Sequence, residues 1–415
     1  MIWRKEEIPT DWRTSVICPI FKKGDPKCIE NYRGISLLDV GYKVLSTCLL
    51  RRIQDVSEQM IGDYQCGFKK GKSTIDHIFT LRQILSKHYE YNKNIHLVFV
   101  DFKQAYDSII RNKLWKNLTT LGIQNKIVNL IKLCKSNTKC VVRVQGELLD
   151  PFEVGKGLRQ GDALSPVLFN LALESVLRRM PRRQIMELNE NHTLLAYADD
   201  IIILGLSINQ EKTKYMFMTR EARDNEDDSD LEVDGISFQQ VHDFKYLGVN
   251  INNRNCMHNE IKLRLKAGNG CYFAMSHLFK SKLLSRKNKE KLYTTYLRPV
   301  VTYACCTWAT TAGDENKLNI FERKVLRKIY GPVYNPDTQV WEKHERKIQQ
   351  LYGKGNIVQF VKGTRMEWAG HVWRADNSIV KKVIVNNLNR KRPRGRPKQR
   401  WIDVVKRDIQ ELRPD

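Results

Sequence analysis

Three aspartates have the types and surroundings expected of a metal site that performs phosphoryl transfer. Asp199 and Asp200 are adjacent and lie between two short apolar runs. A β-hairpin with this pair at its tip would bring both carboxylates into one small volume, and hard divalent cations prefer such oxygen ligands. Asp101 follows the apolar run 97–100, which is typical of a buried strand. A carboxylate at the end of one buried strand and two at a neighbouring hairpin predict a two-metal centre.

The segments around these aspartates occur in a fixed order: 101–107, 157–166 and 196–200. Together they resemble motifs A, B and C of a reverse transcriptase, and the resemblance is to the enzymes of non-long-terminal-repeat (LINE-like) retrotransposons. It extends through residues 31–38, 65–68 and 244–248 and on into the C-terminal tail. The ordered set is specific, whereas a single Ala-Asp-Asp would not be.

The resemblance implies an α+β fold shaped as a right hand, with fingers, a palm built on a ferredoxin-like sheet, and a thumb. It places the fingers and palm in residues 1–235, the primer grip and thumb in 236–310, and a basic helical tail in 311–415. It implies an RNA-directed DNA polymerase that uses two Mg²⁺ ions, with Mn²⁺ as a substitute. The implied partners are an RNA template, a DNA primer or target and dNTPs, and the implied process is DNA integration.

The resemblance also assigns roles to single side chains. Asp101 and Asp199 would bridge both metals, and Asp200 would be a weaker third ligand. Lys212 would protonate the leaving pyrophosphate. The residues assigned to nucleotide binding are Lys22, Lys23, Arg33, Phe102, Tyr106, Gln160 and Gly161. Tyr106 would exclude a 2′-hydroxyl from the incoming sugar, with core packing as the alternative. The primer grip would be Tyr246, Leu247 and Gly248.

The charge of the chain predicts a polyanionic partner. Its 71 Lys and Arg residues against 46 Asp and Glu residues give a net charge of +25, with a sequence pI of about 9.6. Residues 281–415 hold 30 of the basic residues but only 13 of the acidic ones. A nucleic acid is the usual partner of such a chain. A soluble basic protein of another kind is the alternative, and the polymerase motifs argue against it.

The tail holds a Pro/Gly/Arg-rich segment, 391–400, in which four basic residues are assigned to nucleic acid: Arg392, Arg394, Arg396 and Lys398. An extended Arg-Gly-Arg can lie in a narrow A·T minor groove. Non-specific phosphate contacts by a generic basic tail are the favoured alternative. Trp368, His371 and Trp373 could stack on bases, although packing is the more frequent role at their spacing.

Cysteine usage and hydropathy bound the location of the chain. The ten cysteines form no Cys-x-x-Cys pair and no cluster with histidine, which predicts reduced thiols and no zinc site. No signal peptide or membrane-length apolar run is present, so an intracellular site without a membrane partner is expected, with the nucleus as its place. The chain opens within what resembles the interior of a polymerase region. We therefore expect part of a longer element, without the endonuclease domain that many relatives carry upstream. Template, target site and oligomeric state stay open.

Several elements can be placed from local signals. A strand is expected at 16–20, followed by a turn at 21–26. Ser73 is expected to cap a helix that runs to about Tyr91, with Asp76 as its capping-box partner. Ser165 is expected to cap, and Pro166 to open, a helix that runs to about residue 180, and Asp107 is expected to cap another. Residues 221–234 are expected to form a solvated loop, and residues 318–329 an amphipathic helix.

The connection after the Asp-Asp pair is unusually short. Only nine residues, 205–213, separate the strand that ends at Leu204 from the strand expected at 215–218. The family has a helix here, because parallel strands of one sheet need a crossover of a dozen or more residues. An internal deletion near 204–206 is therefore expected, after which the second strand would fail to pair or would pair as a hairpin. This makes a catalytically impaired nucleic-acid-binding protein the alternative function. An RNA-dependent RNA polymerase is a third possibility, which Tyr106 disfavours.

Overall fold

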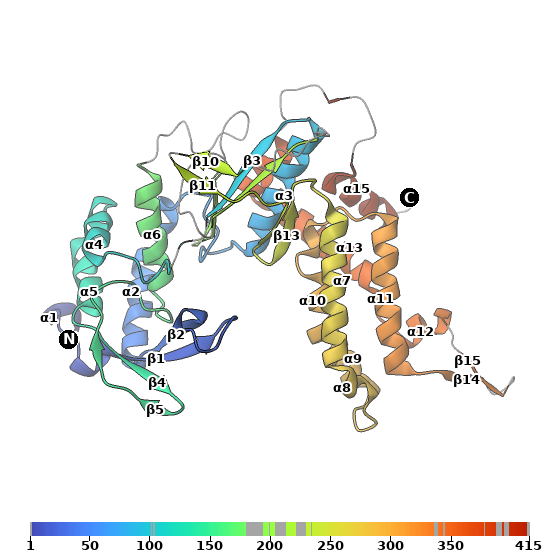
Figure 1. Ribbon diagram of the computed structural model, residues 1–415, viewed down its shortest axis with the longest axis horizontal. Helices are drawn as coiled ribbons and strands as arrows, with labels where there is room; N and C mark the ends of the chain where they lie inside the picture. The colour runs from blue at the N-terminus through green and yellow to red at the C-terminus, as the bar shows by residue number, and fades with distance from the viewer. Residues whose placement is uncertain are drawn as a thin grey trace. The chain divides into compact units, whose positions relative to one another are not determined.

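A computed structural model describes the following residues: 2–100, 102, 104–179, 194–198, 200–203, 213–220, 230–233, 235–335, 339–342, 345–376, 378–386, 392–393 and 398–412. The chain forms two compact units (Figure 1). The first comprises residues 1–74, 98–214 and 232–238, and the second comprises 75–97, 215–231 and 239–415. Helices and sheets are mixed, in agreement with the expected α+β class. No helix in the described ranges is long and apolar enough to cross a membrane.

A small sheet and five helices build most of the described part of the first unit. Strand β1 pairs antiparallel with β2 and parallel with β4, and β4 also pairs with β5 and β6. The bounds are β1 Thr14–Phe21, β2 Tyr32–Leu37, β4 Lys139–Val144, β5 Glu147–Leu148 and β6 Phe152–Glu153. The helices are α1 Ile2–Lys5, α2 Val40–Met60, α4 Arg111–Thr120, α5 Asn125–Lys135 and α6 Ser165–Leu177. The strand predicted at 16–20 is confirmed, and Gly24 makes the turn after it with φ +94°.

The start of α6 differs from the prediction. Ser165 lies inside the first turn, and its buried Oγ has no hydrogen-bond partner among the described residues. Asp162 makes the turn instead: its Oδ1 accepts from the Leu164 N–H (3.2 Å) and its carbonyl accepts from the Ser165 N–H (3.1 Å). The prediction that Ser165 caps the helix is therefore wrong, whereas Pro166 does lie in the first turn.

A four-stranded sheet has the order β7-β8-β3-β9, with bounds β3 Ile95–Val100, β7 Leu194–Tyr197, β8 Asp200–Ile203 and β9 Lys214–Met218. In the first unit, β8 pairs antiparallel with β7 on one side and with residues 98–100 of β3 on the other. In the second unit, β9 lies beside β3, where His96 Nδ1 and the Tyr215 hydroxyl are 2.6 Å apart. The expectation that β9 would stay unpaired or form a hairpin with β8 is wrong, because both edges of β8 are occupied and β3 offers a free one.

The second unit is mainly helical. Its helices are α3 Thr74–Glu90, α7 Met257–Ala274, α8 Ser276–Lys280, α9 Arg286–Leu292, α10 Arg298–Thr302, α11 Ala312–Tyr330, α12 Glu345–Tyr352, α13 Ile357–Arg374, α14 Ile379–Val385 and α15 Trp401–Leu412. Its hairpins join β12 Asp243–Tyr246 to β13 Val249–Asn252, and β14 Val333–Asn335 to β15 Val340–Glu342. A further short pair, which joins β10 Leu231–Val233 to β11 Ile236–Phe238, belongs to the first unit except for Leu231. The predicted helices 73–91 and 318–329 are confirmed as α3 and α11, and the apolar stripe of α11 is buried.

Candidate active site

The hairpin expected to carry the paired aspartates is present as β7 and β8. Tyr197 and Asp200 form its last pair, so only two residues join the strands, and Ala198, the first of them, has φ +53°. The register of β3 sets Val100, which precedes Asp101, opposite Ile201, which follows Asp200. Asp101, Asp199, Lys212, Arg394 and Arg396 lie outside the described residues, as does the side chain of Asp200. Their convergence on metal ions stays a prediction.

A short segment that precedes α3 in the chain supports this hairpin through Gln65. Residues 64–66 lie along β7, where Ala196 donates to one of their carbonyls and accepts from one of their amides (2.9 and 3.0 Å). The side-chain oxygen of Gln65 accepts from the N–H of Ala198 and from the N–H of Gly67, both at 2.8 Å. Gln65 is 1% exposed. The turn of the hairpin is thus held by a buried side chain from 133 residues earlier in the chain.

The segments that resemble motifs A and B are joined by backbone hydrogen bonds. The N–H of Gly157 donates to Ile109 O (2.9 Å), and the N–H of Leu158 donates to Tyr106 O (2.8 Å). Gly157 has φ +76°, and a Cβ there would lie 2.8 Å from the Cα of Asp107. Asp107 does not cap α4, since that helix begins after Ile110 without a side-chain cap. The prediction of a cap at Asp107 is wrong because turns fill residues 104–108.

The Gln160–Gly161 turn contacts the backbone of β2. The N–H of Ser36 donates to Gln160 O (2.8 Å). Gly161 has φ +112°, and a Cβ at this position would lie 2.6 Å from Ser36 O. The close approach of the β2 backbone therefore requires glycine here, and the nucleotide-binding role assigned to Gln160 and Gly161 stays a prediction.

A buried ion pair that sequence reasoning missed fixes the same loop. Lys135 Nζ contacts Asp162 Oδ2, with both side chains fully buried, and the Tyr42 hydroxyl donates to the same oxygen (2.7 Å). Burial alone would raise the pKa of Asp162, but Lys135 and the hydrogen bonds from Tyr42 and Leu164 hold it below its usual value. Burial lowers the pKa of Lys135, and Asp162 opposes that effect. Nothing local in the sequence could have paired two residues 27 positions apart.

A buried arginine, also missed, holds the chain that leads into this loop. Arg111 Nε donates to Gly157 O (2.9 Å), and its Nη1 donates to the carbonyls of Val154 (2.9 Å) and Lys135 (2.7 Å). These carbonyls lie on either side of β4 to β6 along the chain. Arg111 thus joins the end of α5 to the approach to motif B.

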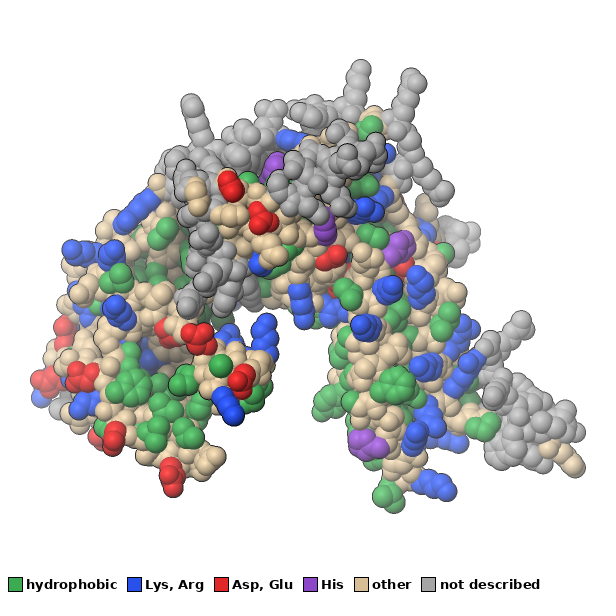
Figure 2. All heavy atoms as spheres, viewed as in Figure 1, with side chains coloured by type: hydrophobic (Ala, Val, Ile, Leu, Met, Phe, Trp, Pro, Cys, Tyr) green, Lys and Arg blue, Asp and Glu red, His purple; other side chains and the backbone are tan. Residues whose placement is uncertain are grey.

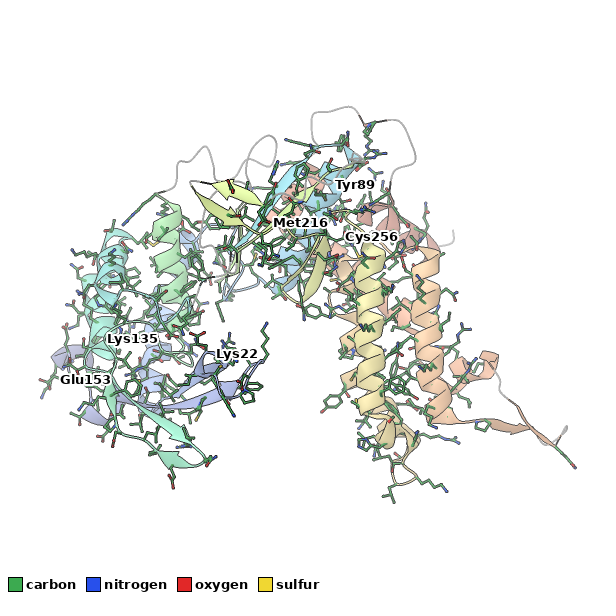
Figure 3. All side chains as sticks on the ribbon, in the orientation of Figure 1. Lys22, Tyr89, Lys135, Glu153, Met216 and Cys256 are labelled. Carbon is green, nitrogen blue, oxygen red and sulfur yellow. The ribbon has the colours of Figure 1, made fainter. Side chains whose placement is uncertain are left out.

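The cations assigned to nucleotide binding lie on the β1–β2 hairpin. Lys22, Lys23 and Arg33 are exposed, and Figure 3 shows Lys22 on that hairpin. Partial burial raises the pKa of Asp107, and the charge of Lys22 opposes this rise. The Lys22 charge is therefore close enough to act on the motif A segment.

The two aromatic residues of motif A lie against the core of the first unit. Phe102 and Tyr106 are half-buried beside it, and the ring of Tyr106 stacks on Phe169 at a centroid distance of 4.9 Å. This contact fixes the orientation of the ring. It is compatible with both roles considered for Tyr106, since a half-buried ring packs on one face and can exclude an atom at its exposed part.

The Tyr-Leu-Gly segment assigned to the primer grip is the turn between β12 and β13. Leu247 has φ +45° and Gly248 φ +81°, the two positive values that a tight hairpin requires. Tyr246 is 4% exposed, and its hydroxyl lies 2.9 Å from His77 Nδ1. The Tyr303 hydroxyl donates to Leu247 O (3.0 Å). Tyr246 anchors the hairpin inward, which leaves Leu247 and Gly248 as its outer part.

The described basic residues of the tail contact their own chain. Arg392 Nε lies 2.8 Å from Glu90, and its guanidinium stands over the Tyr91 ring. Lys398 stands 3.8 Å from the centroid of the Tyr89 ring. Both residues therefore lie at the C-terminal end of α3. Figure 2 shows further Lys and Arg side chains gathered over α11, which lies within the basic part of the chain, residues 281–415.

The aromatic residues of α13 divide between packing and exposure. Trp368 packs edge-on against Phe79 (5.6 Å between centroids) and stacks on His371 (4.8 Å), which supports the packing role. Trp373 is 52% exposed.

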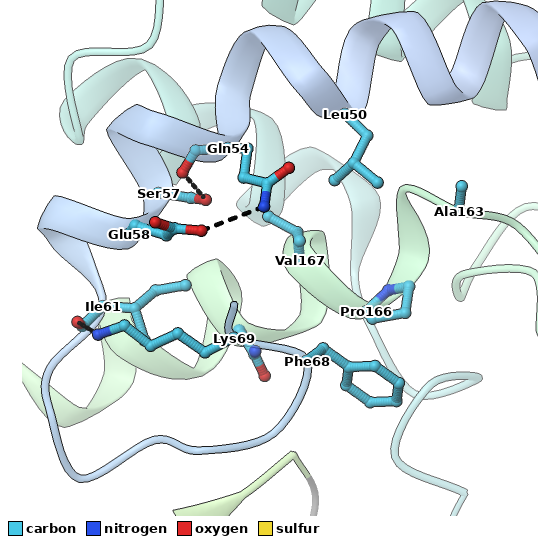
Figure 4. Close-up of a pocket in the computed structure, with 11 residues that line it drawn as sticks. Leu50, Gln54, Ser57, Glu58, Ile61, Phe68, Lys69, Ala163, Pro166 and Val167 are labelled. Carbon is cyan, nitrogen blue, oxygen red and sulfur yellow. Dashed lines mark hydrogen bonds between the residues drawn. The ribbon is translucent and has the colours of Figure 1, made fainter. Parts of the chain in front are cut away.

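A pocket in the first unit lies between α2 and α6 (Figure 4). It is closed on one side by Phe68, which has φ +55° and is 58% exposed, and by Lys69, whose Nζ donates to Ile61 O (3.0 Å). The pocket adjoins the same Gln65–Phe68 segment that supports the hairpin. Across the described residues, no three His, Cys, Asp or Glu side chains form a group that could hold a metal ion.

Comparison with known proteins bears on this geometry. Residues 20–251 match the family model described as reverse transcriptase (RNA-dependent DNA polymerase). The chain is 29% identical over 209 residues to the transposon TX1 uncharacterized 149 kDa protein of Xenopus laevis, covering 49% of this chain and 16% of that protein. It is 24% identical over 365 residues to the probable RNA-directed DNA polymerase from transposon BS of Drosophila melanogaster, covering 79% and 39%.

The chain is also similar to a further retrotransposon protein and to a solved telomerase structure. A type-1 retrotransposable element R2 polyprotein of Popillia japonica is 27% identical over 201 residues, covering 48% of this chain and 28% of that protein. The chain thus spans 16 to 39% of the length of these three relatives. Among solved structures, apo telomerase from Candida tropicalis gives a TM-score of 0.42 at 13% identity, covering 92% of this chain and 70% of that one. A TM-score this low carries no argument about the fold.

Proposed function

Because the chain belongs to the reverse transcriptase (RNA-dependent DNA polymerase) family, we propose that it extends a primer with dNTPs on an RNA template. One observation carries the proposal. The β7–β8 hairpin pairs with β3 in a register that sets the chain neighbours of Asp101 and Asp200, Val100 and Ile201, opposite each other. Two strand ends that meet in this way are where carboxylates for phosphoryl transfer are needed.

The residues that would hold two Mg²⁺ ions are Asp101, Asp199 and Asp200. Three carboxylates fit hard divalent cations, and the tight two-residue turn after Tyr197 suits a hairpin that presents ligands at its tip. When bound, the ions would activate the primer 3′-hydroxyl and neutralise the pyrophosphate. The chain itself would supply the rigid support, since the buried side-chain oxygen of Gln65 accepts a hydrogen bond from the Ala198 N–H. Lys212 would then donate a proton to the leaving group.

The right-hand architecture is the finer form of this proposal. Residues 1–235 would form fingers and palm, with the β1–β2 hairpin as the part that meets the triphosphate. Residues 236–310 would form the primer grip and thumb, with the β12–β13 turn touching the primer. Residues 311–415 would form a basic tail for RNA or DNA. The exposure of Lys22, Lys23 and Arg33 supports the first assignment, and the exposed basic side chains of α11 support the last.

The experiment that tests the proposal is primer extension by Asp199→Asn. The substitution keeps the size of the side chain and removes the negative charge, so extension with Mg²⁺ should be lost while binding to primer–template is kept. Asp55→Asn is the matched control, because Asp55 is exposed on α2 and has no assigned role. Full extension by Asp199→Asn would contradict the proposed metal site. If Asp55→Asn also lost extension, the loss in Asp199→Asn could not be assigned to the missing charge at the proposed site.

The nine-residue connection 205–213 favours a second candidate, a nucleic-acid-binding protein with impaired catalysis. The loss of a helix from this connection would expose an apolar face of the sheet to water. Exposure lowers the free energy of unfolding by roughly 25 cal/mol for each Å² of apolar area. The pairing of β9 with β3 shows that the sheet forms with the connection as it stands. A variant with a helix inserted between Leu204 and Gly205 separates the candidates. Higher stability and restored extension in this variant would favour impairment, whereas efficient extension by the unmodified chain would exclude it.

A further inference from the structure

A cavity of about 280 Å³ lies in the second unit, between α3, the start of α7, the 307–311 segment and the start of α15. Pockets near this size can hold a phosphate group or a small phosphorylated molecule. None of the described residues that line it is acidic, whereas Arg82 and Lys398 are both basic. The charge of the lining therefore suits an anion.

Arg82 is a buried cation with unused donors. It is 6% exposed, and its Nε and Nη2 atoms have no hydrogen-bond partner among the described residues. Its Nη1 lies 2.6 Å from the sulfur of Met257, which is a weak acceptor. Burial lowers the pKa of Arg82 to about 10, so the guanidinium stays charged at neutral pH. Buried guanidinium groups are normally paired with a carboxylate or phosphate, and the described residues supply no such partner to these two atoms.

The carboxylate whose charge acts on Arg82 is already engaged. Glu260 raises the pKa of Arg82, but one of its oxygens accepts from the Asn250 N–H (2.6 Å) and the other accepts from Arg264 Nε (2.7 Å). Glu260 therefore offsets the charge of Arg82 without satisfying its donors. Nε and Nη2 form the fork geometry that binds two oxygens of one anion, and neither has a hydrogen-bond partner in the part of the chain that the structure describes.

Two further features add positive potential to the cavity. Helix α7 has 18 residues and begins there, with Cys256, Met257 and His258 in the lining (Cys256 is labelled in Figure 3). No described side chain caps this N-terminus, so its first N–H groups can bind an anion. Lys398 also lines the cavity, and its described partners, Arg254 O (2.5 Å) and the Tyr89 ring, are uncharged.

We propose that this cavity, the Arg82 pocket, binds a phosphate-type anion held by the Arg82 guanidinium, the N-terminal amides of α7 and Lys398. The side chain of Met257 covers the Arg82 guanidinium, because its sulfur lies in contact with Nη1. This flexible thioether must change rotamer before an oxygen of the ligand reaches the guanidinium. A backbone phosphate of a nucleic acid and the phosphate of a free nucleotide present the same oxygens. The site includes none of the residues proposed for catalysis, so it goes beyond the polymerase function.

Thermal unfolding of the full chain in EDTA tests the pocket without any catalytic step. Inorganic phosphate should raise the unfolding temperature relative to chloride at equal ionic strength, because a ligand of the folded state stabilises it. Arg82→Met, which keeps the packing and removes the donors, should weaken phosphate binding at least tenfold, and Lys398→Gln about threefold. Lys381→Gln is the matched control, since it also removes one positive charge. Lys381 lies on α14, where it pairs with Asp376 and does not line the cavity. Met257→Ala should bind phosphate at least as tightly as the unmodified chain.

A second variant covers the possibility that Arg82→Met does not fold. Ser86→Glu places a carboxylate one helical turn from Arg82 in the lining of the pocket, so it should fill the site from within and abolish the phosphate effect. Competition by a ten-residue oligothymidylate and by thymidine monophosphate then separates the two sources of the anion. Displacement of phosphate by either supports the pocket and identifies its source. No stabilisation of the unmodified chain by 50 mM phosphate, or equal stabilisation of Arg82→Met or Ser86→Glu, would overturn it.

Discussion

Gln65 offers the most direct test of how the fold supports the hairpin of the paired aspartates. Its side-chain oxygen accepts two buried backbone N–H groups, those of Ala198 and Gly67, at 2.8 Å each. Gln65→Met has a similar volume and cannot accept either bond. Each buried donor left unsatisfied costs about 1–3 kcal/mol, so we expect the free energy of unfolding to fall by about 2–4 kcal/mol after partial relaxation. That is a large share of the about 5–15 kcal/mol typical of a folded protein, yet the chain should stay folded at room temperature.

The same substitution should affect catalysis more than stability alone explains. Ala198 precedes Asp199 in the two-residue turn, and its positive φ needs support from its surroundings. If the Ala198 bond contributes about 1.4 kcal/mol to holding the turn for reaction, its loss should lower turnover about tenfold, at one tenfold step for each 1.36 kcal/mol. We also expect the Mg²⁺ concentration for half-maximal extension to rise, because displaced ligands bind the ions less well.

Urea unfolding and primer extension over a range of Mg²⁺ concentrations measure both effects. Asn170→Leu is the control, because Asn170 is also buried and its hydrogen bond goes to Gly67 O (2.8 Å) and not to the Ala198 turn. It should lose stability but keep turnover within about threefold of the unmodified chain. A Gln65→Met chain that loses stability but extends primers as well as the control would refute the argument that this residue positions the turn. Unchanged stability would refute the strength of the two bonds.

Four other predictions concern single residues or a pair of residues. Asp162→Asn leaves Lys135 buried without its partner and should cost about 3–5 kcal/mol in urea unfolding. Because the folded pKa of Asp162 is depressed, its contribution should be present above about pH 4 and be lost as pH falls through that lower pKa, a step that the Asn variant lacks. Gly161→Ala should lower stability by more than about 1 kcal/mol, since its Cβ meets a backbone carbonyl of β2 at 2.6 Å and φ is +112°. Tyr106→Val should raise the ratio of ribonucleotide to deoxynucleotide use in primer extension; an unchanged ratio would leave only the packing on Phe169. Replacing Arg394 and Arg396 with alanine should lower the slope of log binding constant against log salt by up to roughly 1.8 on duplex DNA, at about 0.9 for each lost phosphate contact. A lost preference for A·T over G·C duplexes would indicate the minor-groove hook instead.

Patterns along the chain were enough to identify the family and most of the local elements. Hydrophobic periodicity predicted α3 and α11, and the apolar runs on either side of the Asp-Asp pair predicted the β7–β8 hairpin, because these features depend on neighbours within a few positions. The ordered motifs identified a reverse transcriptase, which the match over residues 20–251 confirmed. Where a local signal failed, as for the caps expected at Ser165 and Asp107, the helix started from a turn that a neighbouring segment had already fixed.

Contacts between distant side chains became visible only in the folded chain. Gln65 reaches Ala198 across 133 positions, Lys135 reaches Asp162 across 27, and β9 joins β3 because the edges of β8 are taken. That Arg82 Nε and Nη2 find no acceptor among the described residues is equally invisible in the sequence, since it depends on every element packed around them. A buried polar group has to be satisfied by whatever the fold brings near it, and that requirement carries no periodicity along the chain.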